Sequence, residues 1–268
     1  MDTHYSRYLN IRSATRKSRK PVFGKSVKKI IHFLFSFLNE MSTAEQHLAI
    51  LGKHLGFEHS RILDIGSGGG ELSLALSHKG AKVTGIECSR DQMKRAIARQ
   101  GKDCNFMFSV GENLPFRDSW FDATVFLNSI HHIPEDSMET AISEAISVTK
   151  YGGIVYVAES LAEGACFELD SPVEDETEVR AQAQQCLNKA IRSHSKFSED
   201  AEERYEVYFD YQNFEEYKDE MLRFDQSRRH RFEQLEALMR SRFQELGKSI
   251  DQGIRFYQPM LARCFRVL

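Results

Sequence analysis

Apolar positions follow two different periods along the middle of the chain. Short, almost continuous apolar runs are typical of buried strands. They alternate with segments in which apolar residues recur every three or four positions, as on one face of a helix. The runs predict strands over 61–65, 82–87, 105–110, 123–127 and 154–159, and the other segments predict helices that begin near 42, 70, 89 and 137. Strands that alternate with helices form a parallel sheet with helices on both faces, so we expect an α/β fold.

The pattern changes after residue 159. Helical spacing, together with many acidic and aromatic residues, predicts helices over 172–194, 199–209, 214–224 and 228–246. Two apolar runs, 250–256 and 260–268, predict an antiparallel hairpin that turns at Gln258-Pro259. We therefore divide the chain into an arm with one helix (1–41), a core (42–160), a mostly helical insertion (161–248) and a closing hairpin (249–268).

Charge is distributed unevenly, although the net charge is only −3. Residues 1–29 are rich in Lys and Arg with one acid, Asp2, whereas residues 163–220 are rich in Glu and Asp. An acid-poor start rich in Arg and Ser is typical of an organelle-targeting segment, and equally of a solvated basic arm that meets an anionic partner. We favour the arm, which leads into a helix with apolar spacing over 26–39.

A chain of 268 residues with 41% hydrophobic and 28% charged residues is long enough for one α/β domain and an elaboration. The longest apolar run, 30–38, contains His32 and is far shorter than the roughly 20 residues that span a bilayer, so we expect no membrane span. The five cysteines form no C-x-x-C motif and no spacing with histidine that suits a metal. We therefore expect free thiols, a cytoplasmic location and no bound metal.

The stretch 61–76, RILDIGSGGGELSLAL, carries the clearest sign of a ligand site. A strand is followed by a glycine-rich loop and then by the start of a helix, whose first N–H groups are free to bind a ligand. Glycine is needed where the chain turns with positive φ or where a ligand touches the backbone. The dinucleotide fingerprint requires glycine or alanine where this chain has Glu71. Asp64, two residues before the first glycine, would repel a pyrophosphate but suits a ligand with an ammonium or sulfonium group.

This stretch resembles motif I of the class I S-adenosylmethionine (SAM) methyltransferases. Four further segments resemble motifs of the same family and follow in the same order: the acid that ends the second strand, the E-x-L-P-F tail at 112–116, the histidine segment NSIHHIP at 128–134 and the KYGG turn at 150–153. The resemblance covers about residues 45–160. It implies a Rossmann-like, doubly wound, seven-stranded and mostly parallel sheet with an antiparallel final strand, and a helical lid in the insertion.

The resemblance also implies SAM as methyl donor and S-adenosylhomocysteine as product. Glu87 is expected to bind the two ribose hydroxyls with its two oxygens. Val110 stands where the family usually has the aspartate that reads the adenine amino group, so adenine recognition would depend on the backbone of Val110 and Gly111 and on apolar packing. The expected cofactor-binding residues are Asp64, Gly66, Ser67, Gly68, Gly70, Glu87, Cys88, Met93, Val110, Gly111, Glu112 and Phe126.

Methyl transfer from SAM requires few catalytic groups from the protein, because the sulfonium already activates the methyl group. The protein must align the acceptor with the carbon–sulfur bond and exclude water. A base is needed only for a hydroxyl, an acidic carbon or a protonated amine, and His131 and His132 are equivalent candidates on sequence alone.

We predict methyl transfer to oxygen, nitrogen or carbon of a small-molecule acceptor, which the aromatic lid suggests is aromatic or hydrophobic. One alternative is an RNA or protein methyltransferase that uses the basic arm to hold its substrate. The other is a non-catalytic SAM-binding scaffold protein. The sequence leaves the oligomeric state open.

Overall fold

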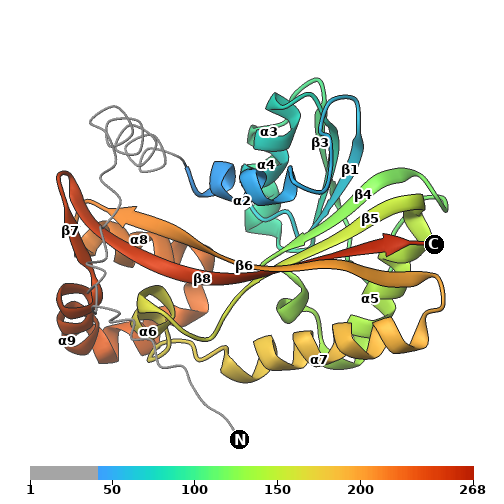
Figure 1. Ribbon diagram of the computed structural model, residues 1–268. Helices are drawn as coiled ribbons and strands as arrows, with labels where there is room; N and C mark the ends of the chain where they lie inside the picture. Colours follow the sequence, from blue (N-terminus) through green and yellow to red (C-terminus); the bar gives the residue numbers. More distant parts are fainter. Residues whose placement is uncertain (1–41) are drawn as a thin grey trace, which may run out of the picture. The chain divides into compact units, whose positions relative to one another are not determined.

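One mixed sheet organises the part of the chain that the computed structural model describes, residues 42–268. The strand order is β3-β2-β1-β4-β5-β8-β6, with the short β7 paired to β8 outside this path (Figure 1). The strands are β1 (Arg61–Ile65), β2 (Lys82–Glu87), β3 (Cys104–Phe108), β4 (Phe121–Leu127), β5 (Thr149–Ser160), β6 (Phe197–Tyr211), β7 (Lys248–Ile250) and β8 (Gly253–Val267). β1 to β5 run parallel, and β8 runs antiparallel to both β5 and β6. The α/β sheet with an antiparallel final strand is confirmed, but in the described residues it has eight strands rather than the predicted seven, because the short β7 pairs with β8.

Helices cover both faces of the sheet, as the alternating pattern predicts. They are α2 (Thr43–Leu51), α3 (Glu71–His78), α4 (Arg90–Ala98), η1 (Ile130–His132), α5 (Glu135–Val148), α6 (Ala165–Asp170), α7 (Thr177–Ser193), α8 (Phe214–Phe224), η2 (Gln226–Arg228) and α9 (Arg229–Leu246). Figure 1 shows α5 and α7 on one face and α2, α3 and α4 on the other. The basic arm and the helix predicted over 26–39 lie outside the described residues.

The central strands are hydrophobic throughout because both of their faces are buried. In β1, Leu63 joins the core under α5 and α7, and the neighbouring Ile62 joins the core under α2 and α3. At the start of α2, Ser42 and Glu45 form the predicted capping box, in which each side chain bonds the other residue's backbone N–H. Among residues 42–268, no helix has both the length and the hydropathy to cross a membrane.

The helix predicted over 199–209 is wrong, because this segment lies inside the fifteen-residue strand β6. Its acidic residues pair with arginines of β8. Glu199 accepts two hydrogen bonds from Arg263, at 2.6 and 3.0 Å, and Asp210 accepts two from Arg255, both at 2.7 Å. Pairing across strands outweighs the weak helical preference of an acidic segment. The partner strand is distant in the sequence, so local periodicity could not reveal it.

The predicted turn at Gln258-Pro259 is also wrong. β8 passes through both residues without interruption, and the hairpin between β7 and β8 turns at residues 251–252 instead. β8 stays paired at this point, because Pro259 lies opposite Glu206 of β6 and its carbonyl accepts a 2.9 Å hydrogen bond from the N–H of Leu161, just beyond β5.

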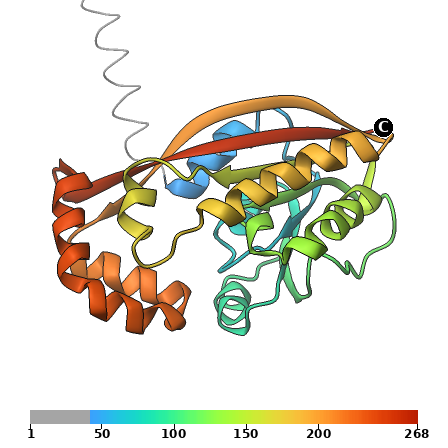
Figure 2. The same ribbon diagram turned by 90° about the horizontal axis from the view of Figure 1, so that it is seen from below.

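β6 and β8 extend past the end of β5 and carry a helical unit of α6, α8 and α9 (Figures 1 and 2). About half of the aromatic residues of the insertion pack within this unit. Tyr211, Phe214, Tyr217, Phe232, Phe243 and Phe256 form a buried cluster of their own. They stabilise the unit, so its aromatic content gives no reason to expect an aromatic acceptor.

Candidate functional site

A cavity of about 820 Å³ lies at the carboxyl ends of β1, β2 and β4. This is where open parallel sheets bind ligands, because the loops that leave neighbouring strands separate there. Its walls come from the glycine-rich loop after β1, residues 86–89 at the end of β2, the loop 109–112 and the segment 127–134. The insertion closes the opposite side with Glu174, Arg223, Asp225, Gln226 and Arg228.

The three predicted glycines of the loop have positive φ, but for different reasons. A Cβ on Gly66 would lie 2.5 Å from Cβ of Ser129, and a Cβ on Gly70 would lie 2.5 Å from the ring of Phe106. These two glycines let the loop pack. Gly68 has φ +55°, and its nearest neighbour would be 3.9 Å from a Cβ. Its backbone therefore borders open space in the cavity wall, where a ligand can approach it closely.

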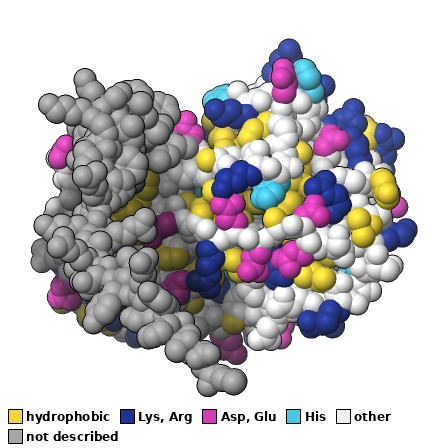
Figure 3. Space-filling view, in the orientation of Figure 1, with side chains coloured by type: hydrophobic (Ala, Val, Ile, Leu, Met, Phe, Trp, Pro, Cys, Tyr) yellow, Lys and Arg dark blue, Asp and Glu magenta, His cyan; other side chains and the backbone are white. Residues whose placement is uncertain are grey.

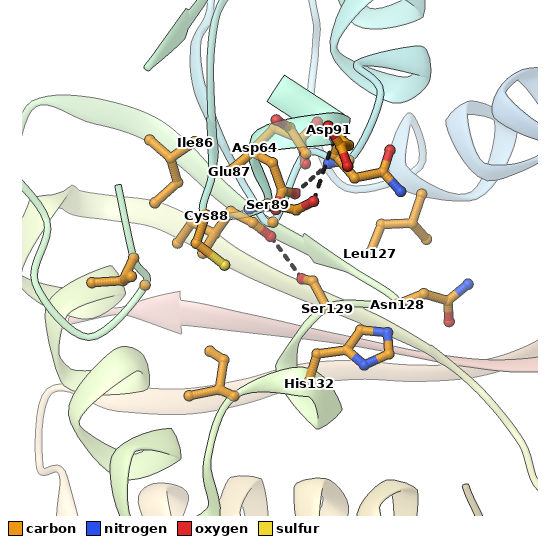
Figure 4. Close-up of a pocket in the computed structure, with 18 of the residues that line it drawn as sticks. Asp64, Ile86, Glu87, Cys88, Ser89, Asp91, Leu127, Asn128, Ser129 and His132 are labelled. Carbon is orange, nitrogen blue, oxygen red and sulfur yellow. Dashed lines mark hydrogen bonds between the residues drawn. The ribbon is translucent and has the colours of Figure 1, made fainter. Parts of the chain in front are cut away.

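Glu87 is held with its carboxylate toward the loop. Its Oε2 accepts a hydrogen bond from the N–H of Gly68 at 2.9 Å, and its Oε1 accepts one from the N–H of Ser89 at 2.7 Å. Each oxygen keeps a second lone pair for a ligand hydroxyl. Figure 4 shows Glu87 and Ser89 on one side of the cavity and His132 on the other. The carboxylate is thus oriented before any ligand arrives.

The cofactor side of the cavity is rich in acid. Asp64 is buried and accepts a 2.6 Å hydrogen bond from the hydroxyl of Ser73. Burial, with further repulsion from Glu87 and Glu71, raises the pKa of Asp64 to about 6 despite that bond. Among the described residues, the Oγ of Ser67 is buried without a hydrogen-bond partner. These residues fit a ligand such as SAM, which brings positive charge for the acids and hydrogen-bonding groups for Ser67.

The structure separates the two histidines that the sequence could not distinguish. His131 is buried, with its Nδ1 hydrogen-bonded to Glu159 and its Nε2 3.7 Å from Oε1 of Glu176. Burial opposes its charge, but the two carboxylates prevail and raise the pKa of His131 to about 9. His131 therefore holds a proton between two acids and has no free nitrogen with which to accept another.

His132 lines the cavity, and its ring centroid lies 4.0 Å from that of His131. Burial, followed by the charge on His131, lowers the pKa of His132. A side chain on the cavity wall can contact an acceptor, so His132 remains the candidate catalytic histidine.

Most of the predicted cofactor residues line this one cavity. Those that line it are Asp64, Gly66, Ser67, Gly68, Glu87, Cys88, Val110, Gly111 and Glu112. Three do not: Gly70 is the N-cap of α3, Met93 is buried on α4, and Phe126 is fully buried in the core of the sheet. Which of these residues bind the cofactor stays a prediction.

Sequence reasoning missed several residues of the wall, including Gln92, Ser109 and Asn128. Asn128 had a usable signal. It has φ +48°, and asparagine is one of the few residues that adopt positive φ readily. Its Oδ1 accepts hydrogen bonds from the N–H of Ser160 at 2.8 Å and from its hydroxyl at 3.0 Å. The lining residues of the insertion gave no signal, because they reach the cavity only through the tertiary fold.

Comparisons with known proteins agree with this geometry. Residues 62–153 match the family model of a methyltransferase domain. The chain is 30% identical over 110 residues to an uncharacterized methyltransferase of Staphylococcus carnosus, covering 41% of this chain and 52% of that protein. It is 31% identical over 104 residues to a ubiquinone biosynthesis O-methyltransferase of Alkalilimnicola ehrlichii, covering 37% of this chain and 41% of that protein.

The fold is shared with the solved structure of a protein assigned as a methyltransferase from Bacillus halodurans C-125. The TM-score is 0.54 at 18% identity, over 82% of this chain and 97% of that one. Residues 62–153 therefore form a methyltransferase domain of the SAM-dependent type, and the chain shares the Rossmann-like fold of a protein assigned as a methyltransferase. The matched region spans about half the length, or less, of these curated relatives.

Proposed function

We propose that this protein transfers the methyl group of SAM to an oxygen atom of a small-molecule acceptor. One observation carries the proposal. A single cavity has the glycine-rich loop and Glu87 on one side and His132 with the polar residues of the insertion on the other. Donor and acceptor can therefore meet in one cavity, and their alignment there is the main requirement of this reaction.

The residues on the cofactor side suit the parts of SAM. The two oxygens of Glu87 would accept from the ribose hydroxyls, and Gly68 would let the ligand lie against the backbone. The acids around Asp64 would favour the positive charge of the ligand. The adenine would lie near Val110 and Gly111, which line the cavity without an acidic side chain to read the amino group. When bound, SAM supplies an already activated methyl group.

Oxygen is favoured as the acceptor atom because a relative in this region is named as an O-methyltransferase. The acceptor side is polar. It carries Glu174, Asp225 and Arg228 beside His132, and Arg228 is paired with Glu174. We propose that His132 contacts the acceptor, whereas His131 positions the surrounding segment. A polar small molecule fits this wall better than the hydrophobic acceptor that the aromatic composition suggested.

Neither alternative gains support from residues 42–268. The basic arm that would hold RNA or a protein lies outside them. On the described part of the face in Figure 3, acidic and basic side chains are interspersed, which does not suit a strip of phosphates. A scaffold protein has no need of a lid that closes polar groups over the cofactor.

Isothermal titration of SAM and S-adenosylhomocysteine into the chain tests the cofactor assignment. We expect binding to the wild type and to Glu58→Gln, a surface control, and strongly weakened binding to Glu87→Ala. Transfer of labelled methyl from SAM to a panel of small hydroxylated acceptors then tests the activity. Absence of SAM binding to the wild type would overturn the proposal.

A further inference from the structure

We propose that His131, His132 and Glu176 form a site for a divalent transition-metal ion on the acceptor side of the cavity. The proposal that these residues bind a metal depends only on the positions of their side chains. The role of the metal in holding the acceptor rests on the proposed function.

Three donor groups converge at this point from two separate elements. A ring nitrogen of each histidine and a carboxylate oxygen of Glu176 lie within 4.8 Å of one another. The histidines belong to η1, and Glu176 is the N-cap of α7. Nε2 of His131 and Oε1 of Glu176 are 3.7 Å apart, too far for a hydrogen bond. Two donors on a tetrahedral zinc lie about 3.4 Å apart for bonds of about 2.0–2.1 Å. Donor atoms that lie within 4.8 Å of one another would therefore have to approach by at most about 1.4 Å to complete the site.

Neighbouring groups already orient two of the three ligands. Glu159 hydrogen-bonds Nδ1 of His131, which leaves Nε2 as its other donor atom. A carboxylate on the second ring nitrogen is the usual support of a metal-binding histidine. Glu159 is itself fixed, since its Oε1 accepts from the N–H of Ser129 at 3.2 Å and of Ile130 at 3.0 Å.

The carboxylate of Glu176 is also oriented by a neighbouring side chain. Arg180, one turn further along α7, donates from Nε at 3.1 Å and from Nη2 to a single oxygen, Oε2. The other oxygen, Oε1, is the one that faces His131. Arg180 is in turn anchored by a 3.0 Å hydrogen bond to the carbonyl of Leu161. The pair therefore presents one carboxylate oxygen to the site from a defined direction.

The charge balance admits a cation. Two acids, the buried Glu159 and the mostly buried Glu176, lie beside the histidines, and Arg180 is the positive side chain paired with Glu176. A divalent ion would balance the remaining negative charge. Two imidazoles with one carboxylate suit zinc, cobalt or nickel better than magnesium or calcium, which prefer oxygen ligands alone.

Three protein ligands leave an open coordination position, as in catalytic zinc sites. Of the three ligands, His132 lines the cavity, whereas His131 and Glu176 lie behind its wall. We infer that the open position is on the side of His132, where the acceptor would lie. A hydroxyl oxygen of the acceptor could occupy it, and the metal would lower the pKa of that hydroxyl so that its proton passes to water. The oxygen would then form a bond to the methyl carbon as the carbon–sulfur bond breaks, which leaves S-adenosylhomocysteine. The site thus predicts acceptors with a metal-binding oxygen. Sequence analysis found no such site because Glu176 is far from the histidines along the chain.

Cobalt(II) titration of the untagged chain tests the site, since a cobalt ion held by imidazoles absorbs in the visible range. We expect one equivalent to bind with visible bands that zinc abolishes. His132→Ala and Glu176→Gln should each bind cobalt at least tenfold more weakly. The surface control His78→Ala should bind it as the wild type does. Circular dichroism must show that both site variants are folded, and His132→Asn and Glu176→Ala replace any variant that is not.

The outcomes separate the two proposals. No cobalt binding to the wild type, or equal binding to the wild type and folded site variants, would overturn the metal site. Cobalt binding without SAM binding would leave the site standing and remove the proposed function. If both bind, methyl transfer should fall at least tenfold after chelation and return with zinc or cobalt. A rate that chelation leaves unchanged would refute the role of the metal in holding the acceptor.

Discussion

Replacing Gly68 with alanine should separate cofactor binding from stability. At φ +55° an L-residue costs about 1–2 kcal/mol, and alanine recovers about 0.4–1 kcal/mol by restricting the unfolded chain. No clash adds to this, because the nearest atom would be 3.9 Å from the new Cβ. We expect a net loss of about 1 kcal/mol, or about 2–4 °C in Tm for a domain of this size.

The same methyl group would lie between the loop backbone and SAM. We expect the Kd of SAM to rise at least tenfold, which corresponds to about 1.4 kcal/mol. Differential scanning fluorimetry measures the first effect, and isothermal titration measures the second. If Gly68→Ala bound SAM as tightly as the wild type, the cofactor could not lie against the loop at this residue.

Gly66→Ala is the matched comparison. Its Cβ would lie 2.5 Å from Cβ of Ser129. Ser129 cannot easily move, because its hydroxyl donates a 2.7 Å hydrogen bond to the carbonyl of Ile65. Overpacking of about 1–3 kcal/mol adds to the backbone strain, so we expect a total of about 2–5 kcal/mol, mostly seen as lost stability. A Tm loss no larger than that of Gly68→Ala would contradict the packing argument.

Three further predictions follow from the contacts. Glu87→Gln should weaken SAM binding by roughly 10- to 100-fold in isothermal titration, because a hydrogen bond to a charged group contributes about 1.5–3 kcal/mol. An unchanged Kd would exclude Glu87 from the cofactor site. Burial raises the pKa of Asp64 to about 6, so we expect the affinity for SAM to fall as the pH drops from 7 to 5, because the protonated acid no longer attracts the cation. The dependence of the Kd on pH should be flatter in Asp64→Asn, and an unchanged dependence would contradict this. Glu199→Gln should lower the free energy of unfolding, measured in urea, by about 1.5–3 kcal/mol, because its partner Arg263 is only 4% exposed. The control Asp200→Asn removes a half-exposed pair and should lower it by less than about 1 kcal/mol. Equal losses would argue against the buried pairing of β6 and β8.

The pH dependence of stability has the opposite sign to that of binding for Asp64. In the folded chain this acid holds its proton up to about pH 6, against an ordinary pKa of 3.8. The folded state therefore binds more protons between these values, and the contribution of Asp64 to stability falls as the pH rises from 4 to 6. Urea titrations of the wild type and Asp64→Asn over this range separate the two effects.

The sequence predicted the core far better than the insertion. β1 and β2 begin and end at the predicted residues, and α2 has the predicted capping box. In these elements the information is local, since a buried parallel strand must be apolar throughout and a helix must satisfy its first N–H groups. The third strand was predicted to reach Val110, but it ends at Phe108. Val110 instead lines the cavity and is 37% exposed.

By itself, the sequence determined the methyltransferase domain and the glycine-rich loop that lines its cavity. Glycine at positions 66, 68 and 70 permits the positive φ of this loop, and Glu87 at the end of β2 accepts a hydrogen bond from the N–H of Gly68. Tertiary structure alone decided that 199–209 is a strand, because the acids of β6 are paired with arginines 45 or more residues away. It also decided that His131 is held between Glu159 and Glu176 while His132 faces the cavity. Neighbours along a chain share a local pattern, but the charges around each side chain come from segments that only folding brings together.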